Sequence, residues 1–281
     1  MQISQLLNQA SKYLKNKNIL SHRIDSEILL SKVLHKSREE LIINFGQHIE
    51  KEKISKFKGL IHRRSLNEPV AYIIKKREFW SRNFIVDRNT LIPRPETELM
   101  VEKIVDIFKM KNISILDIGT GSGCILLSIL NELEHSEGIG IDISKKAIDV
   151  ANKNLKSHKF FNKIKFLRKS LDQIHNKKFD LVVSNPPYIT KNDIRNLNDD
   201  IKKFEPKLAL DGGNDGLDVI KKVIYKSKSI LKFNGMLALE IGNGQYKKVS
   251  QILKLNKFRV KFIVKDYQDN IRCILSSLKH Y

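Results

Sequence analysis

From residue 112 onward the sequence predicts an α/β fold in which helices cover a mostly parallel, seven-stranded sheet. Short apolar segments alternate there with amphipathic helical segments, a pattern typical of parallel strands joined by helical crossovers. Strands are expected near residues 113–118, 138–142, 163–168, 179–184, 235–241, 258–264 and 271–277. No long helical segment separates the last two strands, so we expect them to form an antiparallel pair at one edge of the sheet.

A small all-helical domain is predicted ahead of the sheet, over residues 1–72. Ser37 and Glu40 form a capping-box pattern, and residues 51–66 have the pattern of a basic amphipathic helix. Two further segments carry apolar residues at helical spacing, namely Leu6, Leu7, Ala10 and Leu14, and Ile24, Ile28, Leu29 and Val33. A helical module ahead of a larger domain is most simply interpreted as a partner-recognition element.

A β-hairpin linker is predicted over residues 73–94, with two strands around a polar turn. Pro95 then favours the start of an amphipathic helix that continues through Phe108. Residues 95–281 therefore form the second predicted domain, which contains the sheet.

The chain of 281 residues has 52 Lys and Arg against 31 Asp and Glu, a net charge of +21. Such a charge can indicate nucleic-acid binding. Residues 1–72, however, contribute only +6 of it, so the excess follows chain length, and 40 Lys outnumber 12 Arg although bidentate phosphate contacts favour Arg. We interpret the charge mainly as solvated background, which leaves a weak attraction to ribosomal RNA open.

The two cysteines and the longest apolar stretch indicate the cellular compartment. Cys124 and Cys273 show no ligand spacing and lie in apolar segments, so we expect two small buried side chains, with neither a disulfide nor a bound metal. The longest apolar stretch, residues 124–130, is too short to span a bilayer. We expect a soluble, cytoplasmic protein without a membrane partner, most simply a monomer.

A glycine-rich turn follows the first strand of the predicted sheet. It matches neither the dinucleotide fingerprint nor the phosphate loop. Asp142 ends the second strand, 19 residues after Gly123, where a carboxylate can accept hydrogen bonds from both ribose hydroxyls. We therefore predict a nucleoside ligand without a pyrophosphate, while a helix-capping role for Asp142 stays open. The turn residues that a ligand could approach are Gly119, Thr120, Gly121, Ser122 and Gly123.

The fourth strand is followed by the sequence Asn-Pro-Pro-Tyr at residues 185–188. Its two prolines fix their own backbone angles and hold Asn185 extended. The side-chain oxygen of Asn185 and the carbonyl of Pro186 thus form two fixed acceptors beside the ring of Tyr188. Two acceptors and a flat ring suit a planar NH2 group, whose nitrogen they would orient toward an electrophile. A turn that merely closes the strand, with Asn185 bonded to its own backbone, is the alternative.

The glycine turn, Asp142 and the Asn-Pro-Pro-Tyr segment together resemble the class I, Rossmann-like S-adenosylmethionine-dependent methyltransferases. Asn-Pro-Pro-Tyr alone is shared by enzymes that methylate base amines and by enzymes that methylate glutamine amides. Four additional segments narrow the resemblance: Arg-Glu-Phe-Trp at 77–80, Leu-Ile-Pro-Arg-Pro-Glu-Thr-Glu at 91–98, Glu-Pro at 205–206 and Leu-Ala-Leu-Asp-Gly-Gly-Asn-Asp-Gly-Leu-Asp at 208–218. With them, the sequence resembles the HemK/PrmC family of peptide chain release factor glutamine methyltransferases.

That resemblance implies methyl transfer from S-adenosylmethionine to the glutamine side-chain amide in the Gly-Gly-Gln loop of peptide chain release factors, with S-adenosylhomocysteine as the product. It implies a cofactor site formed by Gly119, Thr120, Gly121, Ser122, Gly123, Asp142, Leu171 and Asn185. Leu171 stands where the family often has an aromatic residue against the adenine, and an ordinary core role for it is open. The residues that would hold the substrate are Asn185, Pro186, Pro187 and Tyr188, with Asn185, Pro186 and Tyr188 as the catalytic group.

Two alternative substrates follow from the same motif. One is an exocyclic amine of a nucleic-acid base, favoured by the net charge but not by the full motif set. The other is a glutamine of a ribosomal protein, the substrate of a related enzyme in which the segment matching residues 93–98 is less clear.

Overall fold

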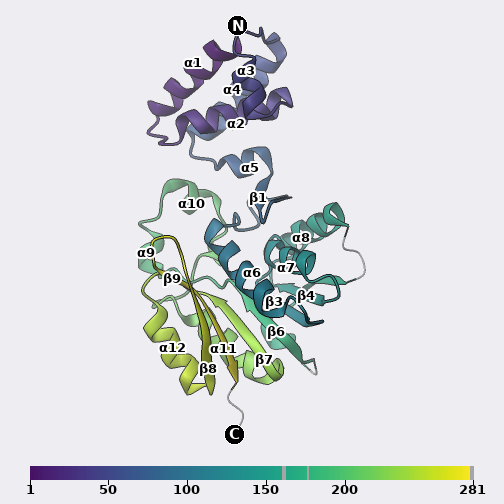
Figure 1. Cartoon of the computed structure of the whole chain (residues 1–281). Coiled ribbons are helices and arrows are strands. Elements are labelled where there is room, and N and C mark those ends of the chain that lie inside the picture. Colours follow the sequence, from purple (N-terminus) through teal and green to yellow (C-terminus); the bar gives the residue numbers. More distant parts are fainter. Residues whose placement is uncertain (160–162, 176, 279–281) are drawn as a thin grey trace. The chain divides into compact units, whose positions relative to one another are not determined.

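The computed structural model describes residues 1–159, 163–175 and 177–278 (Figure 1). It contains two compact units. The helical unit comprises Met1–Lys76 together with Asn198–Phe204, and the sheet unit comprises Arg77–Leu197 and the chain from Glu205 onward. Within the described ranges, no helix has the length and apolar character needed to cross a membrane.

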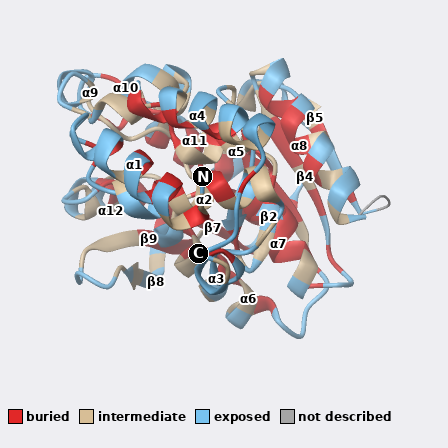
Figure 2. Cartoon of the chain, turned by 90° about the horizontal axis from the view of Figure 1, so that it is seen from above, coloured by how far each residue is buried: buried red, intermediate tan, exposed pale blue. Residues whose placement is uncertain are grey.

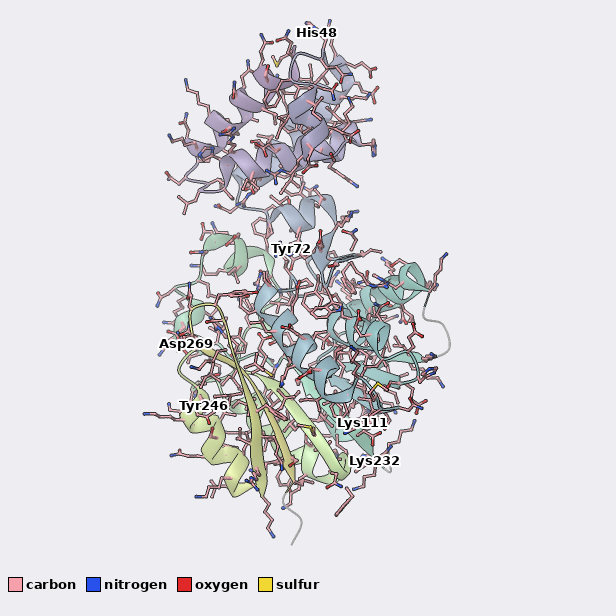
Figure 3. The ribbon with its side chains drawn as sticks, viewed as in Figure 1. His48, Tyr72, Lys111, Lys232, Tyr246 and Asp269 are labelled. Atoms are coloured by element: carbon pink, nitrogen blue, oxygen red, sulfur yellow. The ribbon has the colours of Figure 1, made fainter. Side chains whose placement is uncertain are left out.

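The helical unit confirms the predicted helices and adds two short ones that the sequence pattern did not reveal. Its core is formed by fully buried side chains such as Leu14, Leu29 and Phe57. Gln2 and His48 form an isolated antiparallel bridge, and His48 lies at the surface (Figure 3). The helices are α1 (Ile3–Lys15), α2 (His22–Leu34), α3 (Arg38–Ile43), α4 (Lys51–Ser65), α5 (Val70–Ile74) and α10 (Asp199–Phe204).

Helix α3 begins with the predicted capping box. The Ser37 hydroxyl accepts a hydrogen bond from the Glu40 backbone N–H at 3.2 Å, and the Glu40 carboxylate accepts one from the Ser37 N–H at 2.6 Å. Two of the unpaired N–H groups at the start of the helix are satisfied in this way.

The helical spacing that includes Ile24 is confirmed by α2, but the Ile24 side chain itself is 49% exposed. Its place on the inner face is taken by Asp25, whose carboxylate accepts a hydrogen bond from Arg64 Nε at 2.7 Å. Both side chains of this ion pair are nearly buried. The buried pair is polar, so a search for apolar residues at helical spacing could not identify this face of the helix.

The sheet has the strand order β5-β4-β3-β6-β7-β9-β8, which confirms the predicted seven-stranded, mostly parallel arrangement (Figure 1). Strands β5, β4, β3, β6 and β7 are parallel, and β9 pairs antiparallel with both β7 and β8. The strands are β3 (Ser114–Ile118), β4 (Glu137–Asp142), β5 (Ile164–Arg168), β6 (Phe179–Ser184), β7 (Leu231–Glu240), β8 (Phe258–Lys265) and β9 (Ile271–Leu278).

Helices cover both faces of this sheet. One apolar cluster joins α6 (Pro95–Phe108), α7 (Cys124–Glu132) and α8 (Lys145–His158) to one face, and a second joins α11 (Asp218–Ile230) and α12 (Tyr246–Leu255) to the other. Figure 2 shows buried positions along the strands and exposed positions on the outer sides of the helices.

Both cysteines, Cys124 and Cys273, are buried as expected. Short elements complete the unit, namely α9 (Lys191–Ile194) and two 3-10 turns, η1 (Leu171–Gln173) and η2 (Lys207–Ala209).

The predicted hairpin is formed by β1 (Arg77–Phe79) and β2 (Arg82–Phe84), which pair antiparallel. Its two turn residues, Trp80 and Ser81, both have positive φ angles, 51° and 54°. Hairpin turns of this kind normally use Gly or Asn, because other residues adopt such angles at a cost. Side chains of neighbouring helices hold this turn: the Trp80 N–H donates to Glu98 at 3.1 Å and its indole N–H to Glu132 at 3.0 Å.

Candidate active site

The carboxyl ends of β3, β4 and β6 lie side by side, because β3 pairs with both of the other strands. From β3 the chain continues to β4 and β5 on one side, and it then returns to β6 on the other side of β3. Ligands bind at such a switch in strand order in open α/β sheets. A cavity of about 360 Å³ opens there. The predicted residues that line it are Gly119, Thr120, Gly121, Ser122, Asp142, Leu171, Asn185 and Pro187, whereas Gly123, Pro186 and Tyr188 are not part of its wall.

The three glycines of the turn after β3 have positive φ angles of 72°, 54° and 81° at Gly119, Gly121 and Gly123. A β-carbon on Gly119 would meet no atom within 4 Å, so its backbone faces open space in the cavity. At Gly123 a β-carbon would come within 2.7 Å of the Phe166 ring. The first glycine therefore leaves room for a ligand at the backbone, whereas the last allows the turn to pack on the sheet.

Asp142 is held in place by two backbone groups. One oxygen accepts from the Gly121 N–H at 3.1 Å and the other from the Ser144 N–H at 2.9 Å. The helix cap of α8 is Ser144, whose hydroxyl accepts from the Ala147 N–H at 3.2 Å. Burial raises the pKa of Asp142, while these backbone donors lower it. Each carboxylate oxygen retains a second lone pair, so Asp142 can still accept hydrogen bonds from a ligand.

Asp117, which the sequence prediction did not single out, lies fully buried beneath the glycine turn. One of its oxygens accepts from the Thr120 hydroxyl at 2.5 Å, and the other has no hydrogen-bond partner among the described residues. Burial raises the pKa of Asp117 to about 7, and the negative charge of Asp142 adds to the shift. A substantial fraction of Asp117 is therefore protonated at neutral pH.

Leu171 combines the two roles that the sequence left open. It lines the cavity and also packs against the apolar cluster beneath η1. An aliphatic side chain in this position offers a flat ligand a packing surface but no ring to stack on.

The Asn-Pro-Pro-Tyr segment is supported from behind by glycine-rich backbone. A β-carbon on Gly212 would come within 2.8 Å of the Pro187 carbonyl oxygen, and one on Gly216 would overlap the Tyr188 carbonyl oxygen. The Gln245 amide donates to that same Tyr188 oxygen at 3.0 Å. The glycines at 212–216 were visible in the sequence as part of the family motif, but their contact with residues 187–188 was not.

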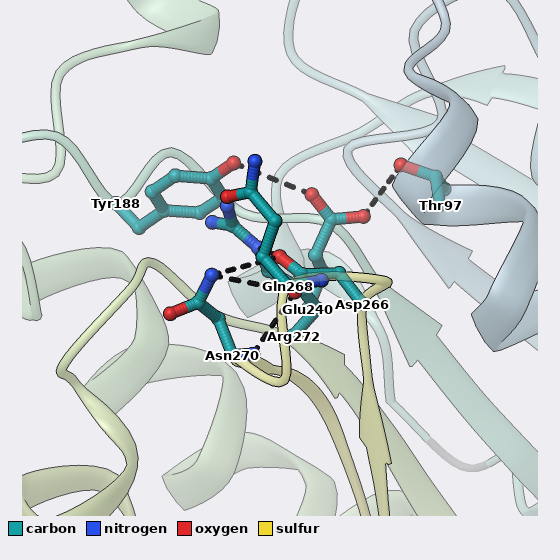
Figure 4. Close-up of polar contacts among 7 residues, drawn as sticks. All are labelled: Thr97, Tyr188, Glu240, Asp266, Gln268, Asn270 and Arg272. Carbon is teal, nitrogen blue, oxygen red and sulfur yellow. Dashed lines mark hydrogen bonds and ion pairs between the residues drawn. The ribbon is translucent and has the colours of Figure 1, made fainter.

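Two polar side chains missed by the sequence prediction lie beside this segment, Thr97 in the first turn of α6 and Glu240 at the end of β7. The Asn185 side-chain nitrogen donates to the Thr97 hydroxyl at 3.4 Å. The Thr97 hydroxyl donates to Glu240 at 2.6 Å, and the other Glu240 oxygen accepts from the Tyr188 hydroxyl at 3.4 Å (Figure 4). A single buried carboxylate thus contacts the tyrosine of the motif directly and its asparagine through one hydroxyl.

Arg94 and Glu205 anchor the segment before α6 at the cavity wall. Arg94 donates to one Glu205 oxygen at 2.6 Å, and the backbone N–H of Ile92 donates to the other at 3.4 Å. The Glu205 side chain is almost fully buried. This pair brings the Pro-Arg-Pro-Glu and Glu-Pro segments, which are far apart in the sequence, into contact.

The residues present fit a nucleoside-containing cofactor. The cavity offers a fixed carboxylate, a turn whose first glycine faces open space, and an aliphatic wall. With the strand order of the sheet, these features define a class I S-adenosylmethionine-dependent methyltransferase.

Two family models match the chain, one described as PrmC N-terminal domain at residues 5–74 and one as Methyltransferase small domain at residues 95–203. A release factor glutamine methyltransferase from Clostridium acetobutylicum is 38% identical, over 98% of this chain and 98% of that protein. The chain belongs to the family of release factor glutamine methyltransferases.

Further relatives are longer or more distant. A bifunctional methyltransferase from Rickettsia typhi is 35% identical over 97% of this chain and 56% of that protein. The chain spans only a little more than half the length of this and related Rickettsia proteins, 56 to 58%. The crystal structure of a ribosomal protein L11 methylase from Lactobacillus delbrueckii subsp. bulgaricus shares the fold, with a TM-score of 0.51 and 19% identity over 66% of this chain and 81% of that one.

The melting temperature of Asp117→Asn minus that of wild type should be higher at pH 8 than at pH 5. Folding raises the pKa of Asp117 from 3.8 to about 7, so the folded state holds an extra proton between these values and the wild-type free energy of unfolding falls as the pH rises through them. Asn does not titrate, so the difference in melting temperature between Asp117→Asn and wild type should rise by several degrees from pH 5 to pH 8. Thermal unfolding at both pH values measures this difference, and a constant difference would contradict the raised pKa.

Proposed function

We propose that this protein transfers the methyl group of S-adenosylmethionine to the side-chain amide nitrogen of the glutamine in the Gly-Gly-Gln loop of peptide chain release factors. The orientation of the Asn185 amide is the observation that carries this proposal. Its nitrogen is occupied by Thr97, which leaves its oxygen as the end available to accept a hydrogen bond from a planar NH2 group. The family relationship provides the identity of the acceptor.

Asn185 and Pro186 would act as the two acceptors. The Asn185 oxygen accepts one N–H of the target amide and the Pro186 carbonyl accepts the other, which directs the nitrogen lone pair toward the methyl group. When bound, the cofactor supplies an electrophilic methyl group on sulfur. A nitrogen–carbon bond forms as the carbon–sulfur bond breaks, and the nitrogen releases one proton to solvent. Tyr188 and Pro187 complete the proposed substrate site.

The same proposal assigns cofactor binding to the residues of the cavity wall. Asp142 would accept from the ribose hydroxyls, Gly119 and Gly121 would allow the ligand to approach the backbone, and Leu171 would pack against the adenine. Gly123 would contribute indirectly, through its packing against Phe166. The helical unit would recognise the partner protein as a separate module.

Mass spectrometry of a purified release factor after incubation with this protein and S-adenosylmethionine tests the function. The peptide that contains the Gly-Gly-Gln loop should gain one methyl group on its glutamine. Parallel incubations with bulk RNA, DNA and ribosomal proteins test the alternatives suggested by the net charge and by the shared motif. Label in one of these and none in the release factor would overturn the proposal.

Asp142→Ala should weaken binding of S-adenosylhomocysteine by roughly ten- to a hundredfold, because charge-assisted hydrogen bonds are lost and water restores only part of them. Asp142→Asn keeps one acceptor oxygen and should lose less. Calorimetric titration gives the dissociation constants, with thermal unfolding as a control for the lost bonds to Gly121 and Ser144. Equal affinity in Asp142→Ala and wild type would reject the ribose assignment.

Asn185→Ala should slow methyl transfer by about 10² to 10³-fold, as expected when one oriented polar group is lost from a catalytic site. Release factor affinity should change much less, because most of the protein contact would lie elsewhere. Asn185→Asp keeps an acceptor but adds a negative charge that would stabilise the charged ground state. Single-turnover methylation at saturating cofactor, with binding measured in parallel, separates the two effects. A rate within a few-fold of wild type for Asn185→Ala would make Asn185 a simple turn residue.

A further inference from the structure

We propose that Glu240 is a positioning residue for methyl transfer, which acts through Thr97 to set the end of the Asn185 amide that faces the substrate. This inference rests on the proposed function of Asn185 as an acceptor. Glu240 is not itself part of the cavity wall, but its carboxylate contacts Thr97, which is. Its effect would be exerted entirely through the Thr97 hydroxyl and, on the other side of the motif, through the Tyr188 hydroxyl.

The sheet brings Glu240 to the level of Asn185. Strand β7 pairs with β6 in a parallel register in which Leu239 lies opposite Ser184, so the next residue of each strand emerges at the same edge. Both Glu240 and Thr97 are only 3% exposed. The short contact between them, 2.6 Å, is typical of a hydroxyl that donates to a charged carboxylate.

The charge of Glu240 determines the direction of the whole hydrogen-bond chain. An ionised carboxylate can only accept, so Thr97 must use its single hydroxyl hydrogen toward Glu240. Toward Asn185 the hydroxyl can then only accept, and Asn185 must present its NH2 group to it. The Asn185 oxygen is therefore the end that points away from Thr97. The sequence of donors and acceptors therefore identifies the oxygen end of the Asn185 amide on chemical grounds.

Protonation of Glu240 removes this constraint. A neutral carboxyl group can donate to Thr97, and Thr97 can then donate to the Asn185 oxygen after the amide turns over. The turned amide would present a donor to the NH2 group of the target, which cannot bond to it. Methyl transfer should therefore require the charged form of Glu240.

Burial raises the pKa of Glu240 to about 7, so Glu240 changes its charge, and with it the orientation of the Asn185 amide, within the physiological pH range. The negative charge of Glu96 raises the pKa further, whereas Arg272 and the hydrogen bonds from Thr97 and Tyr188 lower it. Arg272 is itself bonded to Asp266 at 2.8 Å (Figure 4). Other titratable groups that interact with Glu240 have a raised pKa and do not change charge near pH 7, namely Tyr188, Cys124 and Cys273.

A double-mutant cycle tests whether Thr97 acts through Asn185. Thr97→Val should slow single-turnover methylation by roughly tenfold or more, because the amide is no longer oriented, and Thr97→Ser, which keeps the hydroxyl, should lose far less. In an Asn185→Ala background Thr97→Val should cause no further loss. Equal losses in both backgrounds would overturn the proposal, since Thr97 would then act independently of Asn185.

The pH profile tests the role of the Glu240 charge. The wild-type rate should rise with pH through about 7, and Glu240→Gln and Thr97→Val should both flatten this rise. Asp117→Asn is the matched control, because Asp117 is a second buried carboxylate whose pKa is about 7, and this variant should keep the rise. A rise that persists in Glu240→Gln, or that disappears in Asp117→Asn, would contradict the assignment.

An NMR measurement gives a result that does not depend on activity toward a release factor. The side-chain amide signal of Asn185, identified by its loss in Asn185→Ala, should shift with pH near 7 in the wild-type complex with S-adenosylhomocysteine and stay constant in Glu240→Gln. If wild type failed to methylate any release factor but showed this shift, the proposed function would fail, whereas control of the Asn185 amide orientation by Glu240 would stand. A signal independent of pH in wild type would overturn the inference alone.

Discussion

The hydrogen bond of 2.6 Å between the Thr97 hydroxyl and the Glu240 carboxylate is the contact on which the geometry of the site depends. It joins the first turn of α6 to the end of β7, and it connects both to the segment after β6. A buried carboxylate lowers stability unless it is well hydrogen-bonded. Its presence here is understandable if the charge orients groups that must meet a substrate, because functional sites commonly retain features that reduce stability.

A second constraint is the close approach of backbone around Tyr188. Gly212 and Gly216 leave no room for a β-carbon beside residues 187–188, and Gln245 bonds to the Tyr188 carbonyl. The two prolines restrict the segment from within, while the glycines and the glutamine enclose it from outside. Side-chain orientation and backbone position are thus fixed by different residues, and errors in either would misplace the acceptors.

Much of the fold could be predicted from the sequence because its signals are local. Alternating apolar and helical segments predicted the seven strands, and the short connection predicted the antiparallel edge pair. The sequence did not predict features that depend on contacts between residues far apart in the chain. Ile24 is exposed, whereas its neighbour Asp25 is buried in a pair with Arg64, which lies 39 residues away in the sequence. The hairpin was predicted, but the positive φ angles of its turn and the contacts of Trp80 with side chains from two helices were not.

The same distinction holds for the site. Asn185 and Asp142 belong to short motifs whose chemistry can be inferred from residue type and spacing. Thr97 and Glu240 are 143 residues apart, and neither has a neighbour in the sequence that indicates their contact. Only the parallel register of β6 and β7 places Glu240 beside the motif. Sequence motifs therefore located the groups proposed to touch the ligands, whereas the groups that orient them required the structure.

A crystal structure of this protein with S-adenosylhomocysteine and a release factor would test the acceptor clamp most directly. We predict that the amide nitrogen of the Gly-Gly-Gln glutamine lies within hydrogen-bond distance of both the Asn185 side-chain oxygen and the Pro186 carbonyl oxygen. The Asn185 nitrogen should remain bonded to Thr97. A glutamine turned so that its carbonyl oxygen faces Asn185, with its nitrogen directed away from the cofactor sulfur, would contradict the account.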